Sequence, residues 1–266
     1  MKIRILDFVK NFTVITVLFL CFPVSLSYAA ISATCSATNN GAGSTTSLTH
    51  GCTINADDVI IVLVHVNNDG LNIVDNSGTF TEVINEDNGA ESSTYAIYSK
   101  VSAGSEPATY TWDNDESRDW TVILRVFSGV DTANIWDVTP SAATRDFDDP
   151  GTTATAPTMS ISTSGAMGIL WVISDSSETW SNPTNGYGSA VEEESQSTQA
   201  SYIRLWATTG GTGASSADLG GSNDWLAHQF ALKPAAASGP LKGSVMVVSW
   251  ILPFFNSIKK EVYFNL

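Results

Sequence analysis

Short apolar runs that alternate with turn residues fill the chain between residues 30 and 234. The apolar residues show no sustained helical period there. Instead, valine, isoleucine, threonine, tyrosine and tryptophan recur in short runs separated by glycine, asparagine, aspartate and serine. This pattern predicts an all-β body. We expect its strands at residues 31–36, 44–50, 59–66, 79–84, 93–100, 108–113, 119–127, 158–162, 166–174, 189–193, 201–208 and 225–232.

Two of these runs carry more detail. Residues 119–127 alternate between two faces, with Arg125 on the face opposite to Trp120. Residues 59–66 are apolar on both faces apart from His65, which predicts a central strand covered on both sides.

The body also contains an internal repeat. Landmarks recur in the same order at offsets of about 105 to 108 positions, and these are Trp120 with Trp225, Tyr95 with Tyr202, and Gly78 with Gly186. We expect halves near residues 57–131 and 164–232 to complete a single jelly-roll-like antiparallel β-sandwich over residues 30–234. An irregular loop over residues 131–157 joins them in this prediction. Two separate small sandwiches are the alternative.

Residues 1–29 have the layout of a secretory signal peptide. Lys2 and Arg4 precede an apolar core over residues 12–22, and small residues lead to an exit near Ala29. We expect a signal helix here, and a mature protein that is secreted or held in the cell envelope.

The C-terminal end is a second apolar segment. A small-residue linker over residues 235–243 leads to an apolar tail over residues 244–266, which carries Lys259 and Lys260 near its end. Its apolar run is shorter than the roughly 20 residues that span a bilayer, and Pro253 interrupts it. Membrane association or sorting, an amphipathic helix packed on the body, and an extension without a role remain open.

The formal net charge of −15 restricts the partners of the body. Negative charge repels phosphate, so nucleic acid is excluded as a partner and anionic lipid is disfavoured. Solubility explains the charge most simply, and adaptation to salt or binding of a divalent cation are the alternatives.

Two cysteines remain after removal of the signal peptide, Cys35 and Cys52. An even pair in an exported protein predicts a disulfide. A metal site is the weaker alternative, because His50 is the one nearby residue that suits it.

The sequence offers no clear catalytic set. Its three histidines are His50, His65 and His228, and no Gly-x-Ser-x-Gly motif is present. Glycosidases need two facing carboxylates, but the aspartates and glutamates lie mainly in loops with asparagine, glycine and serine. We therefore expect no catalytic residue.

Calcium is the candidate cofactor. Asp113, Asp115 and Asp119 supply alternating oxygens of the kind that Ca²⁺ binds. The segment lacks the EF-hand glycine and glutamate, because Arg118 and Leu124 occupy those positions. A polar turn between two strands is the alternative.

Three aromatic residues, Trp136, Trp180 and Tyr187, lie outside the clearest strands. Aromatic rings in loops stack on sugar rings, so these are the candidate ligand-binding residues. The alternative is that they close the ends of the core.

Two segments resemble a known group of proteins. The run Gly-Ser-Glu-Pro-Ala-Thr-Tyr-Thr-Trp ends at Trp112, and Phe-Ser-Gly-Val-Asp-Thr-Ala-Asn ends at Asn134. With the Asp-Trp strand that begins at Asp224 and closes at Pro234, they resemble uncharacterised secreted β-sandwich modules of bacteria and phages. The resemblance covers most of residues 57–234 and implies that fold, with no catalytic residues to carry over. The chain departs from the pattern at Ile135, where a proline is expected.

Together these features predict a non-catalytic secreted or cell-surface module that binds a glycan or an extracellular protein through its loops. A carbohydrate-active enzyme domain is one alternative. A phage virion-associated decoration or fibre protein is another, which the signal peptide disfavours because virion proteins assemble in the cytoplasm.

Overall fold

The computed structural model describes residues 28–68, 70–88, 93–142 and 145–237. Within these residues the regular elements are β-strands, all paired antiparallel, and the prediction of an all-β sandwich is confirmed. No helix in the described part of the chain is long and apolar enough to cross a membrane. The predicted apolar tail, most of the linker and nearly all of the signal peptide lie outside the described residues.

The strands form two large sheets and one small sheet. The first sheet has the spatial order β1 (Ser32–Thr49), β6 (Thr109–Ser128), β2 (Ala56–Val66), β5 (Ser93–Ala103) and β4 (Thr81–Asn88), with β3 (Ile73–Asp75) also on β6. The second has the order β11 (Trp180–Ser181), β15 (Ser215–Leu232), β10 (Ala166–Ser174), β13 (Thr198–Trp206) and β12 (Gly188–Glu194), with β7 (Trp136–Val138) and β8 (Arg145–Ala156) also on β15. The small sheet pairs β9 (Ser160–Ile161) with β14 (Gly210–Gly211).

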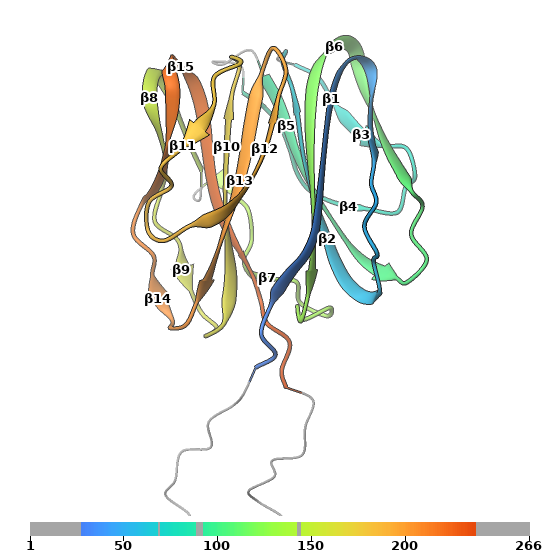
Figure 1. The fold of residues 1–266 in the computed structure, drawn as a ribbon, viewed down its shortest axis with the longest axis vertical. Helices are drawn as coiled ribbons and strands as arrows, with labels where there is room; N and C mark the ends of the chain where they lie inside the picture. The colour runs from blue at the N-terminus through green and yellow to red at the C-terminus, as the bar shows by residue number, and fades with distance from the viewer. Residues whose placement is uncertain (1–27, 69, 89–92, 143–144, 238–266) are drawn as a thin grey trace, which may run out of the picture.

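The two large sheets lie face to face and bury a shared core between them (Figure 1). Alternate residues of the two central strands supply much of this core, namely Val59, Ile61 and Leu63 of β2 with Ile169, Trp171 and Ile173 of β10. The ring of Tyr95 meets the edge of Trp171 with 5.8 Å between centroids. The shared core therefore joins residues from both halves of the chain.

Each sheet also has a core of its own on its outer face. In the first sheet the opening part of β6 bends back, so that Tyr110 and Trp112 pack on Ile60 and Val62, which point away from the shared core. In the second sheet, β8, β11 and the opening part of β15 cover Leu170 and Val172 in the same way. Both central strands are thus covered on both faces, as predicted for residues 59–66.

The strand order of one sheet repeats that of the other. β6, β2, β5 and β4 occupy the places that β15, β10, β13 and β12 occupy in the second sheet. A one-residue bulge recurs as well, since Thr81 and Ile84 pair with Ser99 and Ile97, while Gly188 and Val191 pair with Ile203 and Ser201. A cross-strand hydrogen bond recurs too, from Thr45 to Asp113 and from Thr153 to Asp218, each 3.0 Å.

These matches correct parts of the predicted organisation. The repeating units start with β1 and β8, so each begins earlier in the chain than the predicted halves. The predicted match of Tyr95 with Tyr202 is wrong, because Tyr95 lies in the shared core and Tyr202 lies in the outer core of the second sheet. The four matching strands of each unit lie in one sheet, which differs from a jelly roll with its two Greek keys.

The predicted loop over residues 131–157 is also wrong in part, because it contains β7 and β8. β8 lies against one side of β15 and is rich in aspartate and threonine. Edge strands tolerate polar residues and proline, which is why their sequences resemble loops.

Residues 31–36 and 44–50 were expected as two strands, and so were residues 108–113 and 119–127, yet they form the continuous strands β1 and β6. The glycine-containing stretch of β1 stays paired because Gly41 lies under the ring of Trp120, where a Cβ would approach the ring to 2.6 Å. A glycine that indicates a turn in the sequence here provides room for a tryptophan.

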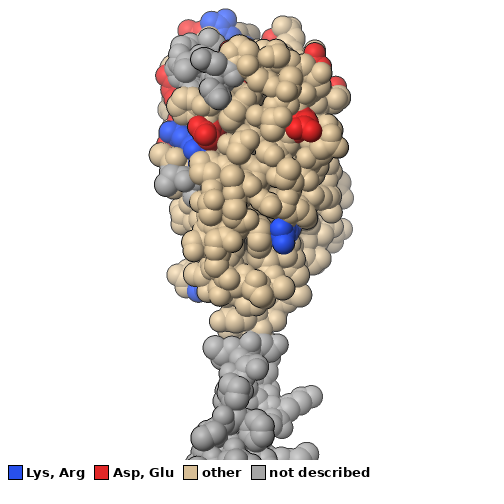
Figure 2. All heavy atoms as spheres, turned by 90° about the vertical axis from the view of Figure 1, so that its left-hand side faces the viewer, with Lys and Arg blue, Asp and Glu red and all other residues tan. Residues whose placement is uncertain are grey.

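The first and last described residues of the body lie side by side at one end of the sandwich (Figure 1). Tyr28 bridges to Ala236, and the N–H of Ala29 donates to the carbonyl of Ala235 at 2.9 Å. Figure 2 shows the outer side of the second sheet, where the acidic side chains gather toward the end away from the termini.

Candidate functional site: a cleft between two strand edges

A cleft of about 480 Å³ opens between β1 and β12, the edge strands at which the two sheets meet. Residues 31–36 form one wall, and Ser189, Ala190 and Val191 form the other. Further along the same two strands, the side-chain amide of Asn40 donates to the Glu193 carboxylate and to the Glu194 carbonyl, which holds the strands together. The cleft thus occupies the stretch over which β1 and β12 are not bridged in this way.

Arg125 lies in this cleft and is the one charged residue that lines it in the described part of the chain. It projects from β6 toward the second sheet and is 3 % exposed. Its Nε donates to Ser201 Oγ at 2.9 Å, and Nη2 donates to the carbonyls of Ser189, at 2.7 Å, and Ser201. Among the described residues, Nη1 has no acceptor.

No carboxylate in the described part of the chain neutralises Arg125. Burial alone lowers its pKa to about 10, so the guanidinium keeps its charge at neutral pH. A buried cation without an ion pair is unfavourable, and proteins usually supply one. Arg145 shows the usual arrangement in this molecule, because it joins the opposite pair of sheet edges and is paired with Glu86.

The local backbone conformation positions one of the carbonyls that accept hydrogen bonds from Arg125. Ser189 lies in the bulge of β12 with a φ of 52°, a left-handed conformation that non-glycine residues rarely adopt, and its carbonyl accepts from Arg125. On the other wall, Ser36 lies directly opposite Arg125 in the register of β1 and β6. Residues opposite each other share a face, so the Ser36 side chain lies beside the guanidinium.

The repeat shows how unusual these residues are. Phe230 follows Trp225 by the same five positions that separate Arg125 from Trp120, and Phe230 is fully buried in the shared core. Ser201 pairs with the first residue after the bulge of β12, and Ile97 pairs with the first residue after the bulge of β4, so the two positions are equivalent. Ile97 is buried in the shared core. The junction of the sheets at the cleft therefore carries arginine and serine at the positions where the other junction carries phenylalanine and isoleucine.

The predicted sugar-binding aromatics lie elsewhere. Trp180 and Tyr187 are each 5 % exposed in the outer core of the second sheet, and half-buried Trp136 packs edge-on against Phe230 with 5.8 Å between centroids. Rings packed in this way offer little free face for stacking. The structure does not bring any of the three into the cleft.

The predicted calcium ligands lie along the bend of β6. Asp113 accepts the hydrogen bond from Thr45, and Asp115 accepts one from the backbone N–H of Asn72 at 3.1 Å. Asp119 pairs with Ala42 of β1. The described residues contain no group of three or more His, Cys, Asp or Glu side chains placed to hold a metal ion.

The histidines are not placed for catalysis either. His65 and His228 are fully buried, and burial lowers the pKa of each to about 3. His50 Nε2 lies 2.9 Å from the Pro107 carbonyl oxygen, and its ring stacks on Tyr110.

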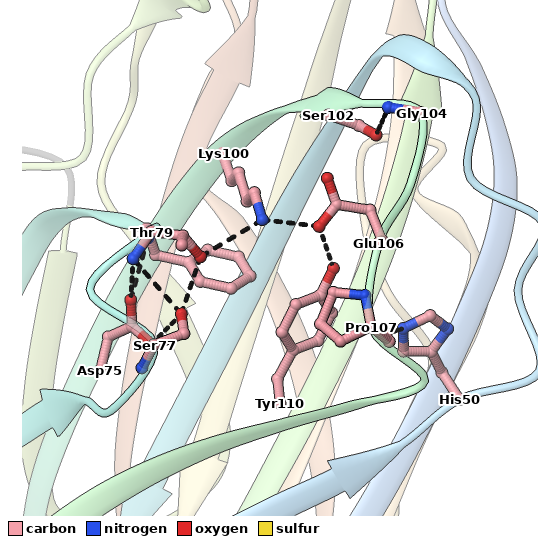
Figure 3. A network of polar contacts seen from close by, with 11 residues as sticks. His50, Asp75, Ser77, Thr79, Lys100, Ser102, Gly104, Glu106, Pro107 and Tyr110 are labelled. Carbon is pink, nitrogen blue, oxygen red and sulfur yellow. Dashed lines mark hydrogen bonds and ion pairs between the residues drawn. The ribbon is translucent and has the colours of Figure 1, made fainter.

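The segment that carries the family resemblance has a structural role (Figure 3). The Glu106 carboxylate is nearly buried and accepts from Lys100 Nζ and from the Tyr110 hydroxyl, each at 2.6 Å. Burial raises the pKa of Glu106, but the hydrogen bonds from Lys100, Tyr110 and Ser102 outweigh this and leave the pKa below its usual value. Lys100 also donates to Thr79, so the network fastens the turn before β4 to the end of β5.

The sequence pattern does not predict the cleft. It places Arg125 on the face opposite to Trp120, which is correct, but it gives no indication that a cleft forms there. The available signal was a lone arginine within an otherwise apolar run.

No family model, curated protein or solved structure matches this chain.

Proposed function

We propose that the protein is an exported, non-catalytic binding module of the cell exterior whose ligand is a glycan or another extracellular protein. The observation that supports this function is the β1–β12 cleft. Its lining contains a buried cation, hydroxyls and apolar side chains, and none of the described residues that line it is aspartate, glutamate, histidine or lysine. Such a lining recognises a ligand but supplies neither a general acid–base pair nor an activated nucleophile.

The disulfide supports the proposed location. Cys35 and Cys52 are joined as predicted, with 5.8 Å between their Cα atoms. Disulfides persist in oxidising compartments outside the cytoplasm. The signal peptide gives the route of export, and the apolar tail beyond the sandwich provides a means of association with the membrane.

We also infer that the sandwich arose by duplication of one unit, and that it belongs with the secreted β-sandwich modules that it resembles. The shared strand order, the shared bulge and the recurring Thr–Asp hydrogen bond support the duplication. The structural roles of Glu106 and Tyr110 explain why a module of this kind carries the Ser-Glu-Pro-Ala-Thr-Tyr run.

The purified exported protein tests the function. It should bind saturably to members of an array of glycans and extracellular proteins, and it should release no reducing ends from the polysaccharides on that array. Hydrolysis of a polysaccharide without stable binding would show that the protein is an enzyme. Absence of both binding and hydrolysis would contradict a binding module.

A further inference from the structure

We propose that the β1–β12 cleft binds a carboxylate carried by an extended peptide, with Arg125 as its ion-pair partner. The inference depends on the proposed binding function and specifies the chemistry of the ligand.

The charge of Arg125 indicates a carboxylate. The guanidinium is buried, uses three hydrogen bonds to hold Ser189 and Ser201, and leaves Nη1 without an acceptor among the described residues. Arginine pairs with carboxylates through planar, charge-assisted hydrogen bonds. A ligand carboxylate at Nη1, with the Ser36 hydroxyl beside it, would provide the negative charge that the protein does not supply.

The repeat indicates that this polarity is not needed for folding. At the equivalent place the molecule packs Phe230 and Ile97 in the shared core. At the other pair of sheet edges, Arg145 has Glu86 as its partner. The other pair of sheet edges thus combines apolar packing with an ion pair, and the cleft at Arg125 has neither.

The shape of the cleft favours a peptide over a sugar. Six consecutive residues, 31–36, form its wall, so it runs along a strand. β1 and β12 each end the strand order of their sheet, and edge strands offer backbone N–H and C=O groups to an added extended chain. Among the residues that the structure describes, no aromatic ring lines the cleft to stack on a sugar.

Fluorescence polarisation with the full exported protein tests the proposal. The probes are fluorescein-labelled pentapeptides Thr-Xaa-Glu-Xaa-Thr, amidated at the C-terminus, with Xaa as Val, Ile, Leu or Tyr. Each is paired with the same peptide carrying Gln in place of Glu. At least one Glu peptide should bind about tenfold or more tightly than its Gln partner, because it alone forms the ion pair. The Arg125 Nε–Hε resonance should shift during that titration.

The repeat supplies the decisive variant. Arg125→Phe combined with Ser201→Ile recreates the junction that Phe230 and Ile97 form, so the fold should survive while peptide affinity falls about tenfold or more. Ala33→Trp is a second variant that leaves Arg125 intact. Ala33 is exposed and lies opposite Phe127 on the inner face, so a large side chain there should fill the cleft. Arg118→Gln removes an exposed arginine outside the cleft and should leave affinity unchanged.

Each other result overturns the inference. Acetate that binds as tightly as the Glu peptides would show a small-anion site, and tighter binding of a galacturonate trimer would show a sugar site. Equal binding of Glu and Gln peptides, or binding that survives in both cleft variants, would exclude the ion pair. Failure of every probe would remove this ligand assignment, while the array of glycans and proteins would still decide the binding function.

Discussion

At the scale of single residues, the two repeats differ in their buried polar groups, because one repeat buries polar side chains at positions where the other buries apolar ones. His65 is fully buried, and neither ring nitrogen has a hydrogen-bond partner among the described residues. Val66 pairs with Trp120 and Ser174 pairs with Trp225, so Ile173 holds the place of His65 in the second sheet. The second sheet therefore buries an isoleucine at the position equivalent to His65 and a phenylalanine at the position equivalent to Arg125.

We predict that His65→Ile raises the free energy of unfolding and makes it depend less on pH. The folded pKa near 3 lies below the unfolded value near 6.5, so the unfolded chain takes up a proton that the folded chain does not as pH falls from 7 to 5. His65 thereby lowers the free energy of unfolding by about 2 kcal/mol over this range, and the variant should lack this share of the pH dependence. Removing the unpaired nitrogens should add about 1–3 kcal/mol at pH 7. Urea unfolding at pH 7 and pH 5 measures both effects, and an unchanged pH dependence would contradict the first.

At the scale of elements, the sequence pattern predicts the central strands well, because their burial produces continuous apolar runs. Residues 166–174 match β10 as predicted, and residues 59–66 lie within β2, because every residue in these two ranges is buried. Edge strand β8 escaped prediction because its polar residues satisfy no burial pattern. The continuity of β1 also escaped, since the contact of Gly41 with Trp120 joins residues far apart in the chain.

Gly41→Ala should destabilise the first sheet. The added Cβ would lie 2.6 Å from Cζ2 of Trp120, so either β1 or the indole must move. We expect the free energy of unfolding to fall by about 1–3 kcal/mol. Gly51→Ala is the matched control, because no atom lies within 4 Å of the Cβ at that position, and its effect should stay within about 0.5 kcal/mol. Equal effects of the two substitutions in chemical denaturation would argue against the steric role of Gly41.

Removal of the disulfide should weaken the same edge. The bond between Cys35 and Cys52 closes a loop with a sequence separation of 17 and ties the cleft wall in β1 to the segment before β2. Replacing both cysteines with alanine should lower the free energy of unfolding by about 3 kcal/mol. Treatment of the native protein with a reductant should lower the midpoint of denaturation to a similar extent. A double variant as stable as the native protein would show that the bond does not constrain the unfolded chain.

The candidate site was less predictable than the fold for a physical reason. The acceptors of Arg125 lie 64 and 76 residues away in the second sheet, so the cleft exists only after the sheets pack. The aromatic residues predicted for sugar binding looked like loop residues because their strands are short or absent, and tertiary packing buried Trp180 and Tyr187. Sequence patterns reveal periodic burial, whereas this site depends on contacts between the two repeats.

At the scale of the whole molecule, the shared core and the two outer cores give opposing expectations for how cooperatively the protein unfolds. Each sheet has an outer core of its own, which would allow the repeats to unfold separately. The shared core contains residues from both sheets, including fully buried Trp171 and Phe230, and it couples the repeats. The two ends of the described body are also joined, since Tyr28 bridges to Ala236. Because a lone sheet would expose its inner face to water, we expect the coupling to prevail.

We therefore predict one calorimetric transition, with equal van't Hoff and calorimetric enthalpies. Trp171→Ala removes a ring from the shared core, and Trp112→Ala removes one from the outer core of the first sheet. Each should cost about 3–5 kcal/mol and lower the temperature of the same single transition. If the repeats were independent sandwiches, Trp112→Ala would split the transition, because the second sheet would keep its original stability. Two resolved peaks in that variant would show that the shared core does not unite the molecule.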